Sequence, residues 1–343
     1  IMIREGSIRR DLKEIVPLVL SKKIYKNRLM FCSDGLDPFD VSNIGHIDHC
    51  VRESIKLGMN SIDAISMASR NCFDYYKLGN DFGGIGPGKV ADILILDDLE
   101  KIKINKVLLG GKIVVSNGKL VEKIPAPKVP TWMQKTVKIP KLQPKNFNVT
   151  SKNNIETVNT ILMRTEIVTK KSSAELDVTN SNVSASYDKD IWKVAALDRT
   201  FGSKTKTVGF LENFGADIGA FASTWSFHEN DMIVIGSNEN DMADACNKLS
   251  KSQGGLIVVK DGKTLASLPF QLGGIISTDP IDKVTKNFTK INDVLSDSGC
   301  KFKKPHLMPL FLPFLALPDI RILFSGIVDV KSRQFIPTIQ TKL

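Results

Sequence analysis

Apolar residues recur every three or four positions over residues 7–19 and 47–72, a spacing typical of amphipathic helices. Between these segments the sequence "LMFCSD" is a short, continuous apolar run that predicts a buried strand ending at Asp34. Ser7 is of a residue type that often caps a helix, and we expect it to begin the first one. The order helix, strand, helix, helix over residues 1–80 is typical of α/β proteins.

The pattern changes over residues 81–124 to that of an antiparallel sheet. Short apolar runs lie in "KVADILILDD" and "INKVLLGGKIVVSNGKLVEK". The dipeptides Gly110-Gly111 and Asn117-Gly118 separate these runs, and both are of the kind that forms tight hairpin turns. We therefore expect a small set of consecutive antiparallel strands here.

The last two segments differ in regularity. Residues 125–190 are rich in Pro, Lys, Asn, Ser and Thr and show little periodicity, so we expect an irregular connection, part of it poorly ordered or formed by irregular edge strands. Residues 191–343 return to strand-like runs such as "DMIVIGS" and "GGLIVVKDGKTLASL". A helical pattern from about Asn240 to Ser252 separates these two runs, which predicts a crossover unit in a second α/β domain.

The composition argues against membrane-spanning, disulfide-rich and cysteine-zinc proteins. The chain has 343 residues, of which 42% are apolar, which suffices for two or three domains. No stretch approaches the roughly 20 apolar residues of a membrane span, so no membrane partner is expected. Five cysteines without a C-x-x-C pair disfavour a disulfide framework and a cysteine zinc site. The opening "IMIREGSIRRDL" does not resemble a leader, so we expect a cytoplasmic location.

The net charge of +10 raises the question of a nucleic-acid partner. The excess is mostly lysine and is scattered from end to end, and only 7% of the residues are aromatic. A surface that stacks bases would combine aromatic and basic residues. We therefore expect no nucleic-acid partner.

Candidate chemistry centres on Asp34. A buried strand that ends on a carboxylate loses hydration energy unless the charge finds a partner, and a metal ion or a reacting group at the end of a barrel strand would be one. On local sequence alone a turn or helix cap is the favoured role for this aspartate. His46 and His49 lie three residues apart, but no H-x-H or H-E-x-x-H motif accompanies them, so surface or capping roles are favoured for both.

Several segments resemble the bacterial and archaeal adenine deaminases of the amidohydrolase superfamily. The resemblance lies in "MIREGS", "MFCSD", "GHID" and "GGIGPGKVADILIL", and near the C-terminus in "GFLENFGADIGAFAST" and "FLALPDIRIL". It implies an α/β fold with the last strands of a TIM-like (β/α)8 barrel in residues 1–80 and a β-sandwich segment in residues 81–124. Residues 191–343 would form the C-terminal α/β domain typical of adenine deaminases. The chain would begin near the seventh barrel strand and lack the earlier metal ligands.

The resemblance also implies a site and a reaction. Asp34 matches the aspartate that ends the eighth strand, binds metal and moves a proton. Arg4, Glu5 and Ser7 match "REGS", and His46 matches "GHID", so these four residues are expected beside the substrate. A hydroxide activated by Mn²⁺ or Fe²⁺ would convert adenine to hypoxanthine and ammonia in a homo-oligomer that binds two metal ions per complete chain. The piece in hand would be inactive alone.

Two departures from the family pattern keep alternatives open. Gly35 stands where the family usually has a second aspartate, and "FHEND" at 227–231 stands where it has "HDSHN". A non-catalytic relative that binds a purine or a partner subunit is therefore the second hypothesis. A dihydroorotase-like amidohydrolase is a third, although it would not share the C-terminal domain.

Overall fold

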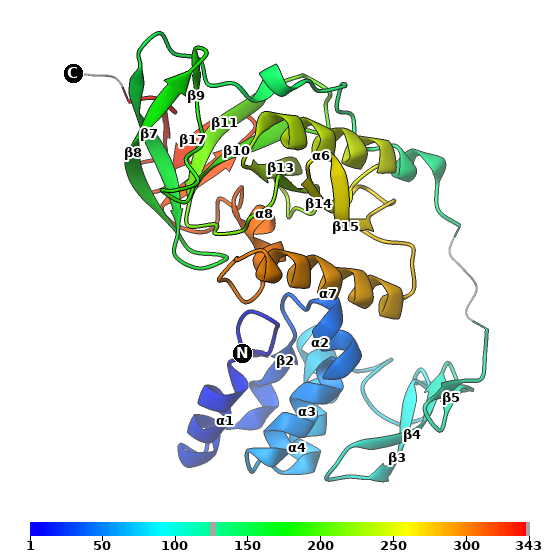
Figure 1. Cartoon of the computed structure of the whole chain (residues 1–343). Coiled ribbons are helices and arrows are strands. Elements are labelled where there is room, and N and C mark those ends of the chain that lie inside the picture. The colour runs from blue at the N-terminus through cyan, green and yellow to red at the C-terminus, as the bar shows by residue number, and fades with distance from the viewer. Residues whose placement is uncertain (124–127, 341–343) are drawn as a thin grey trace. The chain divides into compact units, whose positions relative to one another are not determined.

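The structure is a computed structural model that describes residues 1–123 and 128–340. The chain divides into two compact units, Ile1–Lys128 and Val129–Leu343, which Figure 1 shows as the blue to cyan part and the green to red part. Residues 124–127, where the expected β-segment meets the expected connection, lie outside the described residues. Within the described residues, no helix has the length and apolar character needed to cross a membrane.

The first unit contains a parallel strand pair joined by a helix. Strand β1 (Met2–Arg4) pairs with β2 (Met30–Cys32), so that Arg4 lies opposite Cys32. Helix α1 (Leu12–Ser21) joins the two strands and packs its buried face against them. Because the strands are parallel, their carboxyl ends lie at the same edge, and the loops that follow them start side by side.

Helix α1 begins later than the sequence predicts. Its N-cap is Asp11, and the proposed cap, Ser7, instead accepts a hydrogen bond at Oγ from the Asp37 backbone N–H at 2.8 Å. Residues Glu5 and Arg10 form an isolated antiparallel bridge, so the chain between them folds back as a tight loop. The prediction of a Ser7 cap is wrong because this loop uses the hydroxyl for a contact that is distant in sequence.

Four helices follow β2 within the described part of the first unit. They are α2 (Pro38–Asn43), α3 (Ile47–Lys56), α4 (Ser61–Ala68) and α5 (Arg70–Tyr75). The second helix expected from the sequence, which starts at Ile47, is confirmed. The expected third helix is divided at Ser69, whose Oγ donates a hydrogen bond to the Ile65 carbonyl at 2.7 Å. Serine side chains that bond to the backbone in this way compete with helix continuation.

The antiparallel sheet predicted for the end of the first unit is confirmed. Its strands are β3 (Ile93–Asp98), β4 (Lys103–Leu109), β5 (Lys112–Ser116) and β6 (Lys119–Leu120), paired in sequence order. Both dipeptides proposed as turns have positive φ at each residue, from 49° at Asn117 to 82° at Gly111. Glycine and asparagine tolerate this region of φ best, which is why their positions in the sequence are informative.

A nine-stranded sheet organises the second unit, in the order β15-β14-β12-β13-β10-β11-β7-β8-β9. The strands are β7 (Ile155–Met163), β8 (Thr169–Thr179), β9 (Asn182–Val183), β10 (Ile191–Asp198), β11 (Lys206–Glu212), β12 (Ala220–Ser223), β13 (Asp231–Gly236), β14 (Gly255–Lys260) and β15 (Lys263–Pro269). A separate three-stranded sheet contains β16 (Ile320–Leu323), β17 (Gly326–Asp329) and β18 (Gln334–Ile336).

The expectation of an irregular connection over residues 125–190 is therefore wrong for its second half. Strands β7 and β8 pair over nine positions, and β7 also pairs with β11, so the second domain does not begin at residue 191. Strand β8 is rich in polar residues, lies next to the short edge strand β9 and exposes much of its length. An edge strand tolerates polar side chains that a central strand would not.

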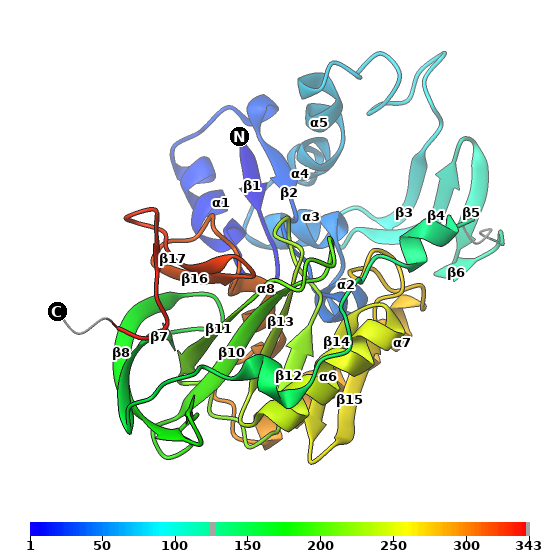
Figure 2. The same ribbon diagram turned by 90° about the horizontal axis from the view of Figure 1, so that it is seen from above.

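Helices cover both faces of this sheet (Figures 1 and 2). Helix α6 (Glu239–Ser252) packs Met242, Cys246 and Leu249 on one face, and α7 (Ile281–Asp297) packs its apolar residues on the other. The β13-α6-β14 order confirms the predicted crossover unit. Strand β12 lies between β13 and β14 and is antiparallel to both.

Candidate functional site

Asp34 follows β2 directly, at the edge where the carboxyl ends of β1 and β2 meet. Its φ of 55° turns the chain sharply, and its side chain is 52% exposed. One carboxylate oxygen accepts a hydrogen bond from the Gly35 N–H at 2.8 Å, and the other lies 3.2 Å from Nη1 of Arg4. The carboxylate is thus held near the end of the strand pair and remains accessible to a ligand.

Arg4 is the residue that connects Asp34 to the loop after β1. Its Nε donates to Asp11 at 3.0 Å, while its Nη1 contacts Asp34. Partial loss of hydration acts to lower the pKa of Arg4, but the two carboxylates outweigh it and raise the pKa above its ordinary value. The side chain is therefore a fixed cation between two acids.

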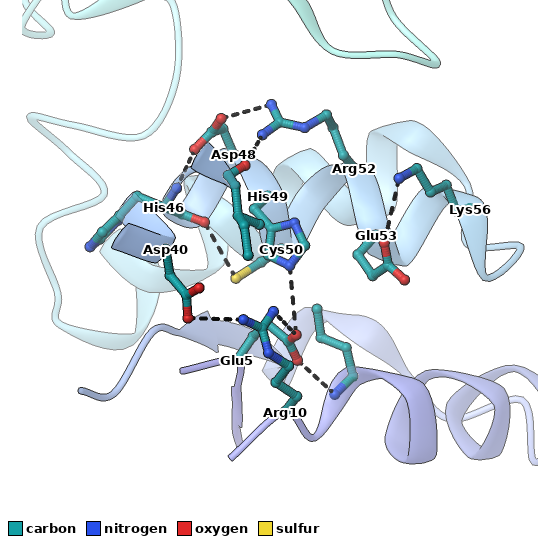
Figure 3. A network of polar contacts seen from close by, with 12 residues as sticks. Glu5, Arg10, Asp40, His46, Asp48, His49, Cys50, Arg52, Glu53 and Lys56 are labelled. Atoms are coloured by element: carbon teal, nitrogen blue, oxygen red, sulfur yellow. Dashed lines mark hydrogen bonds and ion pairs between the residues drawn. The ribbon is translucent and has the colours of Figure 1, made fainter. Parts of the chain in front are cut away.

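Glu5 begins a buried polar network that Figure 3 shows from close by. Its side chain is 3% exposed, and its Oε2 accepts a hydrogen bond from the Leu12 N–H at 3.3 Å. Its Oε1 lies 3.5 Å from Nη1 of Arg10 and 3.6 Å from Nε2 of His49. Arg10 also donates to Asp40 at 2.9 Å, so two carboxylates share one guanidinium. The network ties the loop after β1 to α2 and α3.

Cys50 lies beside this network and is fully buried. Burial, followed in size by the nearby Glu5 carboxylate, raises the pKa of its thiol to about 12. A thiol with such a pKa stays protonated at neutral pH, and the protonated form is neither a good nucleophile nor a metal ligand. Cys50 is therefore a packing residue.

His46 lies at the start of α3 and is exposed. Its backbone N–H donates to Asp48 at 2.7 Å, and its carbonyl accepts the Cys50 thiol at 3.8 Å. Desolvation acts to raise the pKa of Asp48, but hydrogen bonds from the His46 N–H and from Arg52 outweigh it and lower the pKa. His46 lies just before the first residue of α3, whereas the side chain of His49 contacts Glu5 (Figure 3). The two histidines therefore do not belong to one site.

The described residues contain no cluster of three or more His, Cys, Asp or Glu side chains arranged to hold a metal ion. Asp34 is an exposed carboxylate at the strand ends, with Arg4 as its neighbour. The described part of the chain could therefore supply one ligand to a divalent cation but not a complete coordination shell.

Sequence reasoning identified Asp34, Arg4, Glu5, Ser7 and His46 as candidates, and the structure brings Asp34 and Arg4 into contact. Ser7 connects the loop after β1 to the loop after β2 through Asp37. Nothing in the sequence singles out Arg10 or Asp40, which complete the buried network. Charged residues at these positions form no recognisable motif, and only the fold brings them together.

Replacing Glu5 by glutamine in the 343-residue chain is expected to lower the free energy of unfolding of the first unit by about 2 kcal/mol, because Arg10 loses one of two buried anionic partners. Hydrogen exchange of the α1 and β1 amides measures the change. Glu14→Gln, at an exposed position of α1, is the matched control and should change little. Equal exchange rates in both variants would show that the buried network contributes nothing.

Comparisons with known proteins find two matching family models. The amidohydrolase family matches residues 3–121, and the adenine deaminase C-terminal domain matches residues 166–334. An adenine deaminase from Cenarchaeum symbiosum is 54% identical over 339 residues, which is 99% of this chain and 56% of that protein. Adenine deaminases from Desulforamulus reducens and Kosmotoga olearia are 32% and 33% identical, over 98% of this chain and 58% of each relative. The chain spans about half the length of the curated relatives it matches.

Proposed function

The chain belongs to the adenine deaminase family of amidohydrolases, and from this premise we propose that the complete polypeptide hydrolyses adenine to hypoxanthine and ammonia. The observation that carries the proposal in this structure is the position of Asp34. It is an accessible carboxylate at the shared carboxyl edge of two parallel strands, where α/β barrel enzymes place their catalytic groups.

The finer architecture follows from the same premise. We propose that β1 and β2 are the last two strands of a TIM-like (β/α)8 barrel whose earlier strands come from polypeptide outside this sequence. The sheet β3–β6 would then belong to the small β-sandwich, and the second unit would be the C-terminal domain of the family. Both strand edges of a two-stranded sheet need further partners, which supports this placement.

We propose that Asp34 is one ligand of a divalent cation, Mn²⁺ or Fe²⁺, in a binuclear site completed by residues outside this chain. The cation, when bound, lowers the pKa of a coordinated water so that hydroxide is available at neutral pH. Asp34 would accept one proton from the attacking water and deliver it to the ring nitrogen; it would then take the second proton from the new hydroxyl on the substrate carbon and deliver it to the amine, which leaves as ammonia. Its exposure and its position on a sharp turn suit a group that must exchange protons with a ligand.

The other candidate residues have supporting roles in this proposal. Arg4 orients Asp34, since its guanidinium lies 3.2 Å from that carboxylate. Ser7 holds the two loops at the strand ends, and the exposed His46 is available to contact adenine. Glu5 is buried and positions the loop through Arg10 and Leu12. We further propose that the enzyme acts in the cytoplasm as a homo-oligomer.

The test compares the complete polypeptide with the 343-residue chain. The complete polypeptide, loaded with Mn²⁺ or Fe²⁺, is expected to release ammonia from adenine and to lose that activity on chelation. The 343-residue chain alone is expected to show no turnover, because its described residues contain no cluster of three or more side chains that could hold a metal ion. Turnover by the 343-residue chain would contradict the placement of the missing ligands, and a complete polypeptide that is metal-loaded but inactive would contradict the function.

A further inference from the structure

The second unit contains a basic hollow that the proposed deaminase function does not use. Its volume is about 290 Å³, and it lies between residues 139–146, which lead into a 3-10 helix at Pro144–Phe147, and the turn that joins β10 to β11. The side chains at its border include four lysines that are up to 65 positions apart in sequence: Lys141, Lys145, Lys204 and Lys206. The fold thus gathers part of a charge excess that looks scattered along the chain.

None of these four lysines has a carboxylate partner within the part of the chain that the structure describes. The single acid at the hollow, Asp198, is 3% exposed and already accepts four hydrogen bonds. These come from the backbone N–H groups of Thr200, Phe201 and Ser203 and from the Ser203 hydroxyl, at 2.5 to 2.9 Å. Desolvation acts to raise the pKa of Asp198, but these bonds outweigh it and lower the pKa. The Asp198 carboxylate is therefore bound by its own turn and forms no ion pair with the four lysines.

The walls of the hollow are fixed before any ligand arrives. Asn247 of α6 holds Leu142 through two hydrogen bonds of 2.9 and 3.0 Å, and Ser250 donates to the Ile139 carbonyl at 3.2 Å. On the opposite side the Lys138 N–H donates to the Arg199 carbonyl at 2.7 Å. Buried Leu142 and Leu197 form an apolar floor. A site whose backbone is already ordered loses less entropy when it binds.

We propose that this hollow binds a compact polyphosphate anion, either free or as the phosphate end of a nucleotide. Four lysines line this small volume, and an anion with several charges can pair with more of them than a single carboxylate can. Lysine binds phosphate as a point charge with three donors, which suits adjacent phosphate groups. The proposal is independent of deamination, since no residue of the hollow belongs to the first unit.

Calorimetric titration of the 343-residue chain with tripolyphosphate and with ADP tests the proposal. We expect saturable 1:1 binding that weakens as ionic strength rises. The double variant Lys141→Gln/Lys204→Gln should raise Kd by about tenfold or more, since each lost contact is charge-assisted. The matched control Lys286→Gln/Lys301→Gln removes the same charge from α7 and the residues after it, and should stay within about twofold.

Each outcome either distinguishes free polyphosphate from a nucleotide as the ligand or contradicts the proposed site. Equal affinity for tripolyphosphate and ADP identifies free polyphosphate as the sufficient ligand, whereas tighter ADP binding identifies a nucleotide. Equal weakening in both double variants would show a diffuse charge effect and overturn the proposal. The absence of saturable binding, or tighter binding of a single-stranded oligonucleotide that spans many phosphates, would overturn it as well.

Discussion

Replacing Asp34 by asparagine in the complete, metal-loaded polypeptide is expected to lower kcat for adenine deamination by about a thousandfold or more, while stability hardly changes. General acid–base catalysis by one side chain contributes on the order of 10²–10⁴ in rate, and loss of a metal ligand adds to it. Stability should be preserved because the carboxylate is 52% exposed and its contact with Arg4 is a surface ion pair, a kind that contributes little to stability.

Asparagine is the informative substitution because of the backbone at this position. The φ of Asp34 is 55°, a region that asparagine tolerates well and alanine does not. Asp34→Asn therefore removes the negative charge and keeps the turn. Steady-state kinetics and thermal melting measure the two effects separately.

Asp63→Asn provides the matched control for this experiment. Asp63 is also a partly exposed aspartate in an ion pair, with Lys26 at 3.0 Å, but it lies on α4 and away from the strand ends. Its kcat should stay within about twofold of the unmodified enzyme. If Asp34→Asn retains most of the activity, or loses activity only in proportion to a loss of folded protein, Asp34 is not the proton-transfer group.

The largest effect on stability is expected from Glu239→Gln, which should lower the free energy of unfolding of the second unit by about 3 kcal/mol at pH 7. Its partner Lys193 is 1% exposed and lies in the central strand β10. The Lys193 Nζ contacts Glu239 Oε1 at 2.5 Å, Asn182 Oδ1 at 2.9 Å and the Phe147 carbonyl at 3.1 Å. Glutamine leaves the two neutral acceptors in place but leaves the buried ammonium without an anionic partner.

The pH dependence of this loss is a second readout. Desolvation lowers the pKa of Lys193 in the folded state, and the charge of Glu239 limits that decrease. Between the folded pKa and the ordinary value near 10.5, the unfolded chain binds more protons than the folded chain, so stability rises with pH in that interval. Without Glu239 the folded-state pKa of Lys193 falls further, so the pH interval in which stability rises with pH begins at a lower pH. The difference in free energy of unfolding between the unmodified chain and Glu239→Gln should therefore become smaller between pH 7 and pH 9.5.

Denaturant unfolding followed by tryptophan fluorescence suits this test, because the three tryptophans all lie in the second unit. The control is Asp244→Asn on the same helix, whose partner Lys248 lies at 2.6 Å with both side chains 34% exposed. That pair is screened by solvent and should contribute less than about 1 kcal/mol. Equal losses in the two variants, or a deficit that does not change with pH, would contradict a charged pair at Lys193.

Some elements of the fold depend on neighbouring residues, and others depend on residues that are far apart in the sequence. Strands β3–β6 and their turns follow from short apolar runs and from glycine or asparagine at positive φ, and both signals act over a few residues. The same holds for α3 and α6, whose apolar positions recur at helical spacing. The expectation of an irregular connection fails at residues 155–183 because a strand near the sheet edge, such as β8, carries polar residues that resemble a loop.

The sequence by itself determined the family, the α/β character and the position of Asp34 after a buried strand, because motifs, periodicity and turn residues are properties of neighbouring positions. Only the tertiary structure decided that Arg4 faces Asp34, that Arg10 lies between Glu5 and Asp40, and which lysines surround one hollow. The side-chain contacts join residues up to 30 positions apart, and the lysines that line the hollow are up to 65 positions apart. Charge interactions depend on distance in space and burial, and both quantities exist only once the chain has folded.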